Sequence, residues 1–200
     1  MRLFVCSLVI LLCLGTVGFA ADDVDEEMAE ATVAEKTVTV DGHDLQLAYE
    51  AEADGDTIEE FIPADETLEN WTRMAAIRTY EDVNDPMAVA EAVAKQLKEQ
   101  KPPIDYDLLQ NSETGDVAIS FIVWGENAAF AEFNVFQYKK LGDSGLAMYQ
   151  YALRAYDVDV DSFIESLDPE TRMKQVAVTV KFGADQAGTT QDEKDDEKDE

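Results

Sequence analysis

The segment from residue 106 to residue 156 constrains the fold of this chain more than any other part of the sequence. It contains four runs of alternating or continuously apolar residues, which are typical of β-strands, separated by short turn-like stretches. Connections of hairpin length join antiparallel neighbours. The segment therefore predicts four antiparallel strands at Tyr106–Leu109, Val117–Trp124, Phe130–Tyr138 and Leu146–Tyr156, with Val117–Trp124 apolar on both faces as in a central strand.

Further strand-like patterns come earlier in the chain. Lys36–Val40 and Leu45–Tyr49 alternate around Asp41-Gly42, which is a hairpin signal. Trp71–Tyr80 is a third strand-like pattern, with Trp71, Ala75 and Ile77 on one face. Nine acidic residues lie between Glu50 and Glu69, and this acidic stretch is most simply a solvated loop.

Two helical patterns interrupt the strands. The first begins at Asp85, a natural N-cap, and Pro86, a natural first helical residue. Its apolar positions recur at helical spacing, and Pro102-Pro103 ends it. The second is predicted to be capped by Asp161 and to restart at Pro169. Val176–Phe182 fits either the end of that helix or a last strand.

This order of elements predicts an α+β fold, a single antiparallel sheet flanked by helices. The ends of the chain are different in character. Residues 1–20 resemble a signal peptide, with Arg2, an apolar run and Gly18-Phe19-Ala20 before the expected cut. Residues 21–34 and 183–200 are acidic segments that we expect to be disordered. Residues 35–182 would form the single α+β domain.

The charge of the chain excludes several partners. Its formal net charge is -29, and residues 35–182 alone hold 30 acids against 12 bases. Nucleic-acid binding and docking on anionic membranes both need a basic surface. We therefore expect no nucleic-acid partner, and no stable membrane insertion once the signal peptide has been removed. The partner is expected to be an unidentified protein or small-molecule ligand, in the periplasm or outside the cell.

One stretch carries a resemblance to known proteins. Residues 61–72 read FIPADETLENWT, and they resemble a segment in a group of uncharacterised exported bacterial proteins. No activity follows from that group. The order of elements is also similar to that of the PsbP-like α/β/α sandwich, an analogy of fold alone. Independently of both, Trp71 is expected to anchor the turn before its strand to the core, in preference to stacking on a ligand.

Motifs for catalysis are weak in this sequence. Both cysteines, Cys6 and Cys13, would leave with the signal peptide, and His43 is the single histidine. A nucleophile activated by a base, a zinc cluster and a glycine-rich phosphate loop all lack their residues. The sequence therefore indicates no catalytic residue and no cofactor, and it favours a non-enzymatic role.

Three aspartates are the candidate metal ligands. Asp157, Asp159 and Asp161 take positions 1, 3 and 5 of a calcium-loop pattern. Ser162 replaces the glycine of that pattern and Asp168 the usual glutamate. The alternative is a strand-to-helix turn with a capping residue.

Three functions remain after these exclusions. We favour an uncharacterised exported protein that acts as a non-enzymatic binding or structural module of the cell envelope or extracellular space. A pocket on the sheet lined by Trp124, Tyr149 or Tyr151 would support ligand binding. The alternatives are a calcium-binding protein and a hydrolase that uses a pair of carboxylates.

Overall fold

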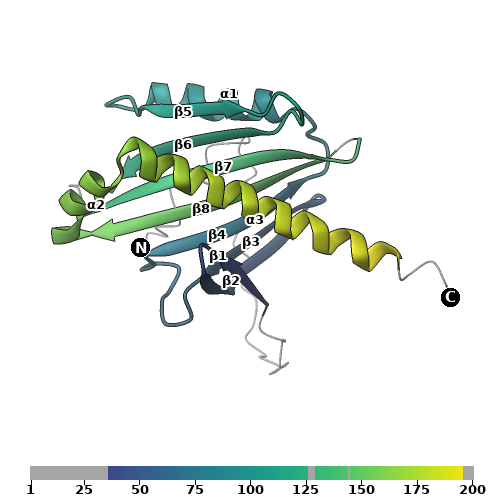
Figure 1. Ribbon diagram of the computed structural model, residues 1–200, viewed down its shortest axis with the longest axis horizontal. Helices are drawn as coiled ribbons and strands as arrows, with labels where there is room; N and C mark the ends of the chain where they lie inside the picture. The colour runs from purple at the N-terminus through teal and green to yellow at the C-terminus, as the bar shows by residue number, and fades with distance from the viewer. Residues whose placement is uncertain (1–35, 126–128, 144, 196–200) are drawn as a thin grey trace.

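The computed structural model describes residues 36–125, 129–143 and 145–195 of the chain. The predicted signal peptide and the whole of the predicted acidic leader lie outside the described residues. Eight strands form one antiparallel sheet in the order β1-β2-β3-β4-β8-β7-β6-β5 (Figure 1). Their bounds are β1 Thr37–Val40, β2 His43–Ala53, β3 Asp56–Ile62, β4 Arg73–Tyr80, β5 Tyr106–Gln110, β6 Val117–Trp124, β7 Phe130–Leu141 and β8 Gly145–Tyr156.

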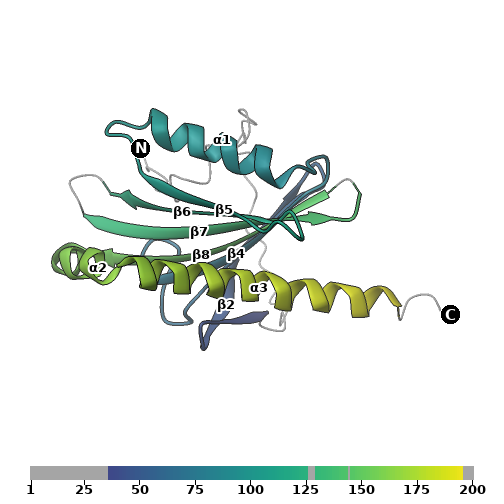
Figure 2. The same ribbon diagram turned by 45° about the horizontal axis from the view of Figure 1, so that its top comes forward.

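Helices lie on both faces of the sheet but cover each face incompletely. α1 (Pro86–Glu99) packs on β5, β6 and β7, whereas α3 (Pro169–Asp195) packs on β8 and β7 from the other side (Figure 2). A single turn of 3-10 helix (Asp157–Asp159) and the short α2 (Val160–Ser166) connect β8 to α3. Much of the surface of the sheet therefore has no helix from the described part of the chain over it.

The predicted architecture of a helix-flanked sandwich is wrong, although the chain does contain both helices and strands. The fold is dominated by its sheet, with 47% strand and 29% helix in the part of the chain that the structure describes. The acidic stretch explains the difference, because most of it forms the β2–β3 hairpin instead of a loop. This hairpin extends the sheet to eight strands. The described helices α1, α2 and α3 cover only part of a sheet of that width.

The β2–β3 hairpin forms despite its charge because its turn and its apolar residues favour it. Asp54 and Gly55 have φ angles of +55° and +87°, the left-handed pair that a two-residue hairpin turn requires. On β3, Phe61 is fully buried and Ile62 is 4% exposed. Glu59 on β3 forms an ion pair with Lys36, the residue directly before β1. This ion pair compensates part of the negative charge of the hairpin.

The first helix forms as the sequence predicts. The carboxylate of Asp85 accepts hydrogen bonds from the backbone N–H groups of Met87 and Ala88, both at 3.0 Å, and Pro86 is the first helical residue. These bonds satisfy two of the donors that a helix N-terminus leaves unpaired. The buried face of α1 consists of Pro86, Ala90, Val93, Ala94 and Leu97.

The last helix begins where predicted and ends later. The carboxylate of Asp168 accepts a 2.7 Å hydrogen bond from the Thr171 N–H, and the helix starts at Pro169. It includes residues 176–182, which resolves that ambiguity in favour of helix. It also continues to Asp195, past residue 183, where the acidic composition predicted a disordered tail. No proline breaks this part of the sequence, and Phe182 is anchored edge-on against Tyr149.

The core is divided between the two faces of the sheet. Under α1, apolar residues of β6, β7 and β8 pack together, including Phe121, Phe136 and Met148. Under α3, the buried residues include Phe61, Tyr149 and Tyr151. Neighbouring residues of one strand point to opposite faces, so Met148 and Tyr149 belong to different halves of the core.

Candidate functional site

Beyond α1, the same face of the sheet changes from apolar to polar. On β8, Met148 packs under α1. Gln150 and Arg154 lie on the same face as Met148, two and six residues further along the strand. On β7, Glu132 and Asn134 share this face. All four are buried, with exposed fractions of 9% or less. We call the polar residues on this part of the face the polar cluster; its members are Glu60, Arg78, Glu132, Asn134, Gln150 and Arg154, and all are buried except Arg78, which is partly buried.

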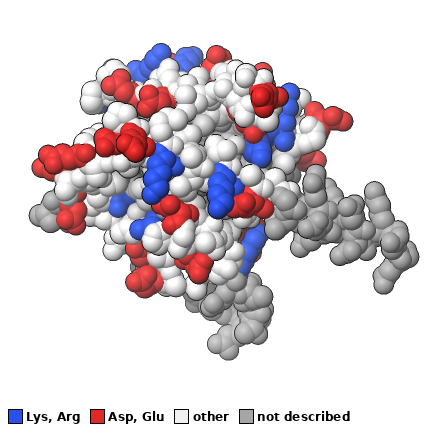
Figure 3. Space-filling view, in the orientation of Figure 1, with Lys and Arg blue, Asp and Glu red and all other residues white. Residues whose placement is uncertain are grey.

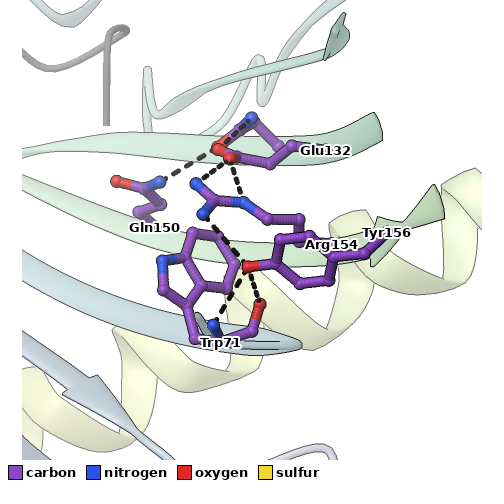
Figure 4. Close-up of polar contacts among 6 residues, drawn as sticks. Trp71, Glu132, Gln150, Arg154 and Tyr156 are labelled. Carbon is purple, nitrogen blue, oxygen red and sulfur yellow. Dashed lines mark hydrogen bonds and ion pairs between the residues drawn. The ribbon is translucent and has the colours of Figure 1, made fainter. Parts of the chain in front are cut away.

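An ion pair between neighbouring strands anchors the cluster. Glu132 lies directly opposite Arg154, and one of its carboxylate oxygens accepts hydrogen bonds from Arg154 Nε at 2.9 Å and from Nη2 (Figure 4). Its other oxygen accepts from Asn134 Nδ2 at 2.9 Å, and the Asn134 oxygen accepts from Gln150 Nε2 at 3.0 Å. The chain of hydrogen bonds fixes the orientation of each side chain along it.

Trp71 closes one end of the cluster. Its indole is fully buried, as the sequence predicts for an anchoring residue. The Arg154 guanidinium lies 3.8 Å from the centre of the indole ring, within the range of a cation–π contact. The Tyr156 hydroxyl donates to the Trp71 carbonyl and accepts from its N–H, both at 3.0 Å (Figure 4). The loop before β4 is thus fixed to the end of β8.

A second pair of opposite charges lies on β3 and β4. Arg78 Nη2 is 3.6 Å from a carboxylate oxygen of Glu60, which is an ion pair beyond hydrogen-bond distance. Burial raises the pKa of Glu60, while Arg78 opposes the rise and Glu132 adds to it. Ala76 lies opposite both Glu60 and Gln150 in the sheet, so this pair and the Glu132–Arg154 pair belong to the same face.

Several hydrogen-bonding atoms of this region are buried without a partner. Within the described part of the chain, these are Arg78 Nε and Nη2, Gln150 Oε1 and Trp71 Nε1. Most buried polar atoms in proteins are hydrogen-bonded, because an unpaired one loses its bonds to water without replacement. Three donors and one acceptor left unpaired on one face of a sheet are the kind of arrangement that a ligand completes.

An apolar recess lies on the same face, beyond Arg78, which does not itself line it. Its volume is about 360 Å³, which is within the range of small-molecule sites. Tyr80, two residues beyond Arg78 on β4, lines it, and so does Tyr138, which is separated from Arg78 in the sheet only by Met148. The rest of the lining comes from the start of α1 and the residues before it: Asp82, Val83, Asn84, Asp85, Ala88, Val89 and Ala92.

The predicted metal ligands lie at the opposite end of β8 from this recess. Asp157 and Asp159 belong to the 3-10 turn, and Asp161 to the first turn of α2. All three are exposed. The helix begins at Val160, one residue before the predicted cap, and no side chain caps it. Among the residues that the structure describes, no group of three or more His, Cys, Asp or Glu side chains is placed to hold a metal ion. Calcium binding stays a prediction.

The other residues singled out in the sequence have structural positions. Tyr149 and Tyr151 are buried under α3, so they do not line an open pocket. Trp124 is 52% exposed at the end of β6. His43 is exposed at the first position of β2.

The polar cluster itself was not predicted, although the sequence contains a signal for it. Glu132 and Arg154 interrupt the apolar pattern of two long strands, and charged residues in central strands are normally paired. Glu60 could not be recognised in this way, because it lies in the stretch predicted as a loop.

Comparison with known proteins places the chain in a family. A family model matches residues 32–182, and the family is uncharacterised. The chain belongs to that family. A search of the curated proteins finds no match. The resemblance to an uncharacterised group is therefore confirmed at the level of the family, whereas the signal peptide and the 61–72 motif stay predictions.

The surface of the protein agrees with its composition. On the face that carries α3, acidic side chains are spread over many elements, with basic ones interspersed (Figure 3). None of the helices in the described ranges is long and apolar enough to cross a membrane.

Proposed function

We propose that this protein is an exported, non-enzymatic binding module that holds a small ligand against the sheet, between the polar cluster and α1. The observation that carries the proposal is the set of buried, unpaired hydrogen-bonding atoms on Arg78, Gln150 and Trp71. Each buried hydrogen-bonding atom without a partner lowers the free energy of unfolding by roughly 1–3 kcal/mol. A ligand that pairs them recovers this free energy on binding.

The neighbourhood of these atoms supports the proposal. The Glu132–Arg154 pair and its hydrogen bonds to Asn134 hold the side chains before any ligand arrives, and such preorganisation lowers the entropic cost of binding. The adjacent recess supplies apolar surface. Export is supported by the predicted signal peptide and by the absence of cysteine after residue 13.

Native mass spectrometry tests the proposal on protein that has been expressed with its own leader and purified as the cell leaves it. We expect the wild-type protein to carry a small molecule that Gln150→Leu loses. Gln110→Leu is the matched control, because Gln110 is exposed on the edge strand β5, and it should retain the molecule. The same bound fraction in all three proteins, or none in the wild type, would contradict the proposal.

A carboxylate-dependent hydrolase is a second candidate, and one observation favours it. Burial raises the pKa of Glu60, and Glu132 contributes to the rise. A carboxyl group with a raised pKa beside a second carboxyl group is an arrangement that acid–base catalysis uses. If this candidate holds, hydrolysis of a panel of chromogenic glycosides and esters by the wild type would be lost in Glu60→Gln. Binding without hydrolysis supports the binding module instead.

A further inference from the structure

We propose that Arg78 binds the carboxylate of an amphiphilic monocarboxylic acid, whose apolar part lies in the recess between α1 and β4. The inference rests on the proposed function, because it names the ligand class for that site. It starts from the identity of the two unpaired Arg78 atoms, Nε and Nη2. These atoms form one edge of the guanidinium group, and their two parallel N–H bonds match the two oxygens of a carboxylate.

That edge is not used by the acidic side chain nearest to it. Glu60 approaches Nη2 only to 3.6 Å, and Arg78 Nε has no hydrogen-bond partner in the described part of the chain. By contrast, Arg154 has both Nε and Nη2 bonded to Glu132. The cluster therefore contains one guanidinium edge hydrogen-bonded to an internal carboxylate and another that has an ion-pair neighbour, Glu60, but no hydrogen bond.

The charges around Arg78 favour a monovalent anion over phosphate. Glu60 and Glu132 both contribute to the potential of the cluster, and a doubly charged group would be repelled twice as strongly. The guanidinium fork can pair with carboxylate and phosphate alike, so the selection between them rests on charge.

The surroundings of Arg78 account for the apolar part of the ligand. Met148 lies directly opposite Arg78 and is 4% exposed. Tyr80 is two residues along the strand, about 7 Å away on the same face, and it lines the recess. Met148 and Tyr80 thus lie between Arg78 and the recess, and the apolar part of a ligand held by Arg78 would pack against these two side chains. Gln150 Oε1, an acceptor without a partner, additionally suits a ligand that carries a hydroxyl or N–H group.

Hexanoate and hexanamide are a matched pair of probes, equal in shape and different in charge. Calorimetric titration of the purified protein should show that hexanoate binds and that hexanamide and inorganic phosphate bind at least about tenfold more weakly. Arg78→Met should weaken hexanoate binding by at least about tenfold, and Arg78→Lys should not rescue it, because lysine lacks the fork. Lys95→Met removes a charge from the exposed side of α1, where its side chain is 77% exposed, and should bind like the wild type.

A second measurement separates binding from folding. The Arg78 Nε–H resonance in the nuclear magnetic resonance spectrum should shift on addition of hexanoate, and Arg78→Lys identifies this resonance by removing it. Equal affinity for hexanoate and hexanamide, or full affinity in Arg78→Met, would overturn the inference. So would failure of hexanoate to bind. A co-purified ligand in native mass spectrometry would still support the proposed function in those cases, and its absence would overturn both.

Discussion

Removal of the charge on Glu132 is the sharpest test of the buried ion pair in the polar cluster. The Glu132 side chain is 3% exposed and that of Arg154 is 7% exposed, so both charges are buried. Glu132→Gln keeps the shape of the side chain but leaves a buried guanidinium beside Trp71 without its carboxylate. Breaking one side of a buried pair costs about 3–5 kcal/mol. For a chain of this length that corresponds to a fall in Tm of about 6–20 °C.

Denaturant unfolding, followed by the fluorescence of Trp71 and Trp124, measures this loss in the free energy of unfolding. The double variant Glu132→Leu with Arg154→Met removes both charges and should recover most of the stability, because a well-packed apolar pair replaces a buried ion pair at little cost. Glu99→Gln is the control: its partner Lys95 is 4.0 Å away and both are exposed, so we expect a change below about 0.5 kcal/mol. A loss below about 1 kcal/mol in Glu132→Gln would refute the reasoning, since it would mean that water reaches the pair.

Four further predictions concern other parts of the chain. Gly183→Ala should destabilise the fold by about 1–3 kcal/mol in the same unfolding assay, because its Cβ would lie 2.7 Å from a Tyr149 ring carbon; unchanged stability would show that the ring can move. Asp85→Ala should cost about 1 kcal/mol by removing the cap of α1, and Asp85→Asn should restore most of it. Glu60 has a raised pKa when folded, so the native state binds the proton more tightly. The free energy of unfolding should therefore fall as pH rises from about 4.5 through the raised pKa, and Glu60→Gln should flatten this fall in urea titrations across pH. Calcium and magnesium should raise the Tm equally by charge screening, whereas a rise with calcium alone that Asp159→Asn abolishes would establish the predicted calcium site.

The sequence by itself determined those elements whose signal is local. Val117–Trp124 is predicted and found with the same bounds, because a short run of eight residues, all apolar except Ser120 and rich in β-branched and aromatic side chains, is typical of a buried strand. The start of α1 follows equally from Asp85-Pro86, where cap and first helical residue are adjacent in the chain. The burial of Trp71 was also predictable, since an isolated tryptophan before a strand is usually an anchor.

Only the tertiary structure decided the extent of the sheet and the candidate site. The acidity of residues 50–62 conceals a strand, because the pairing of β3 with β2 and β4 is a long-range contact that local composition does not report. The same pairing brings Glu60 beside Arg78, and the pairing of β7 with β8 brings Glu132 beside Arg154. Residues far apart in sequence meet because strands in register place every second side chain on one face. The energetic consequence of a buried charge depends on that neighbour and not on the residue alone.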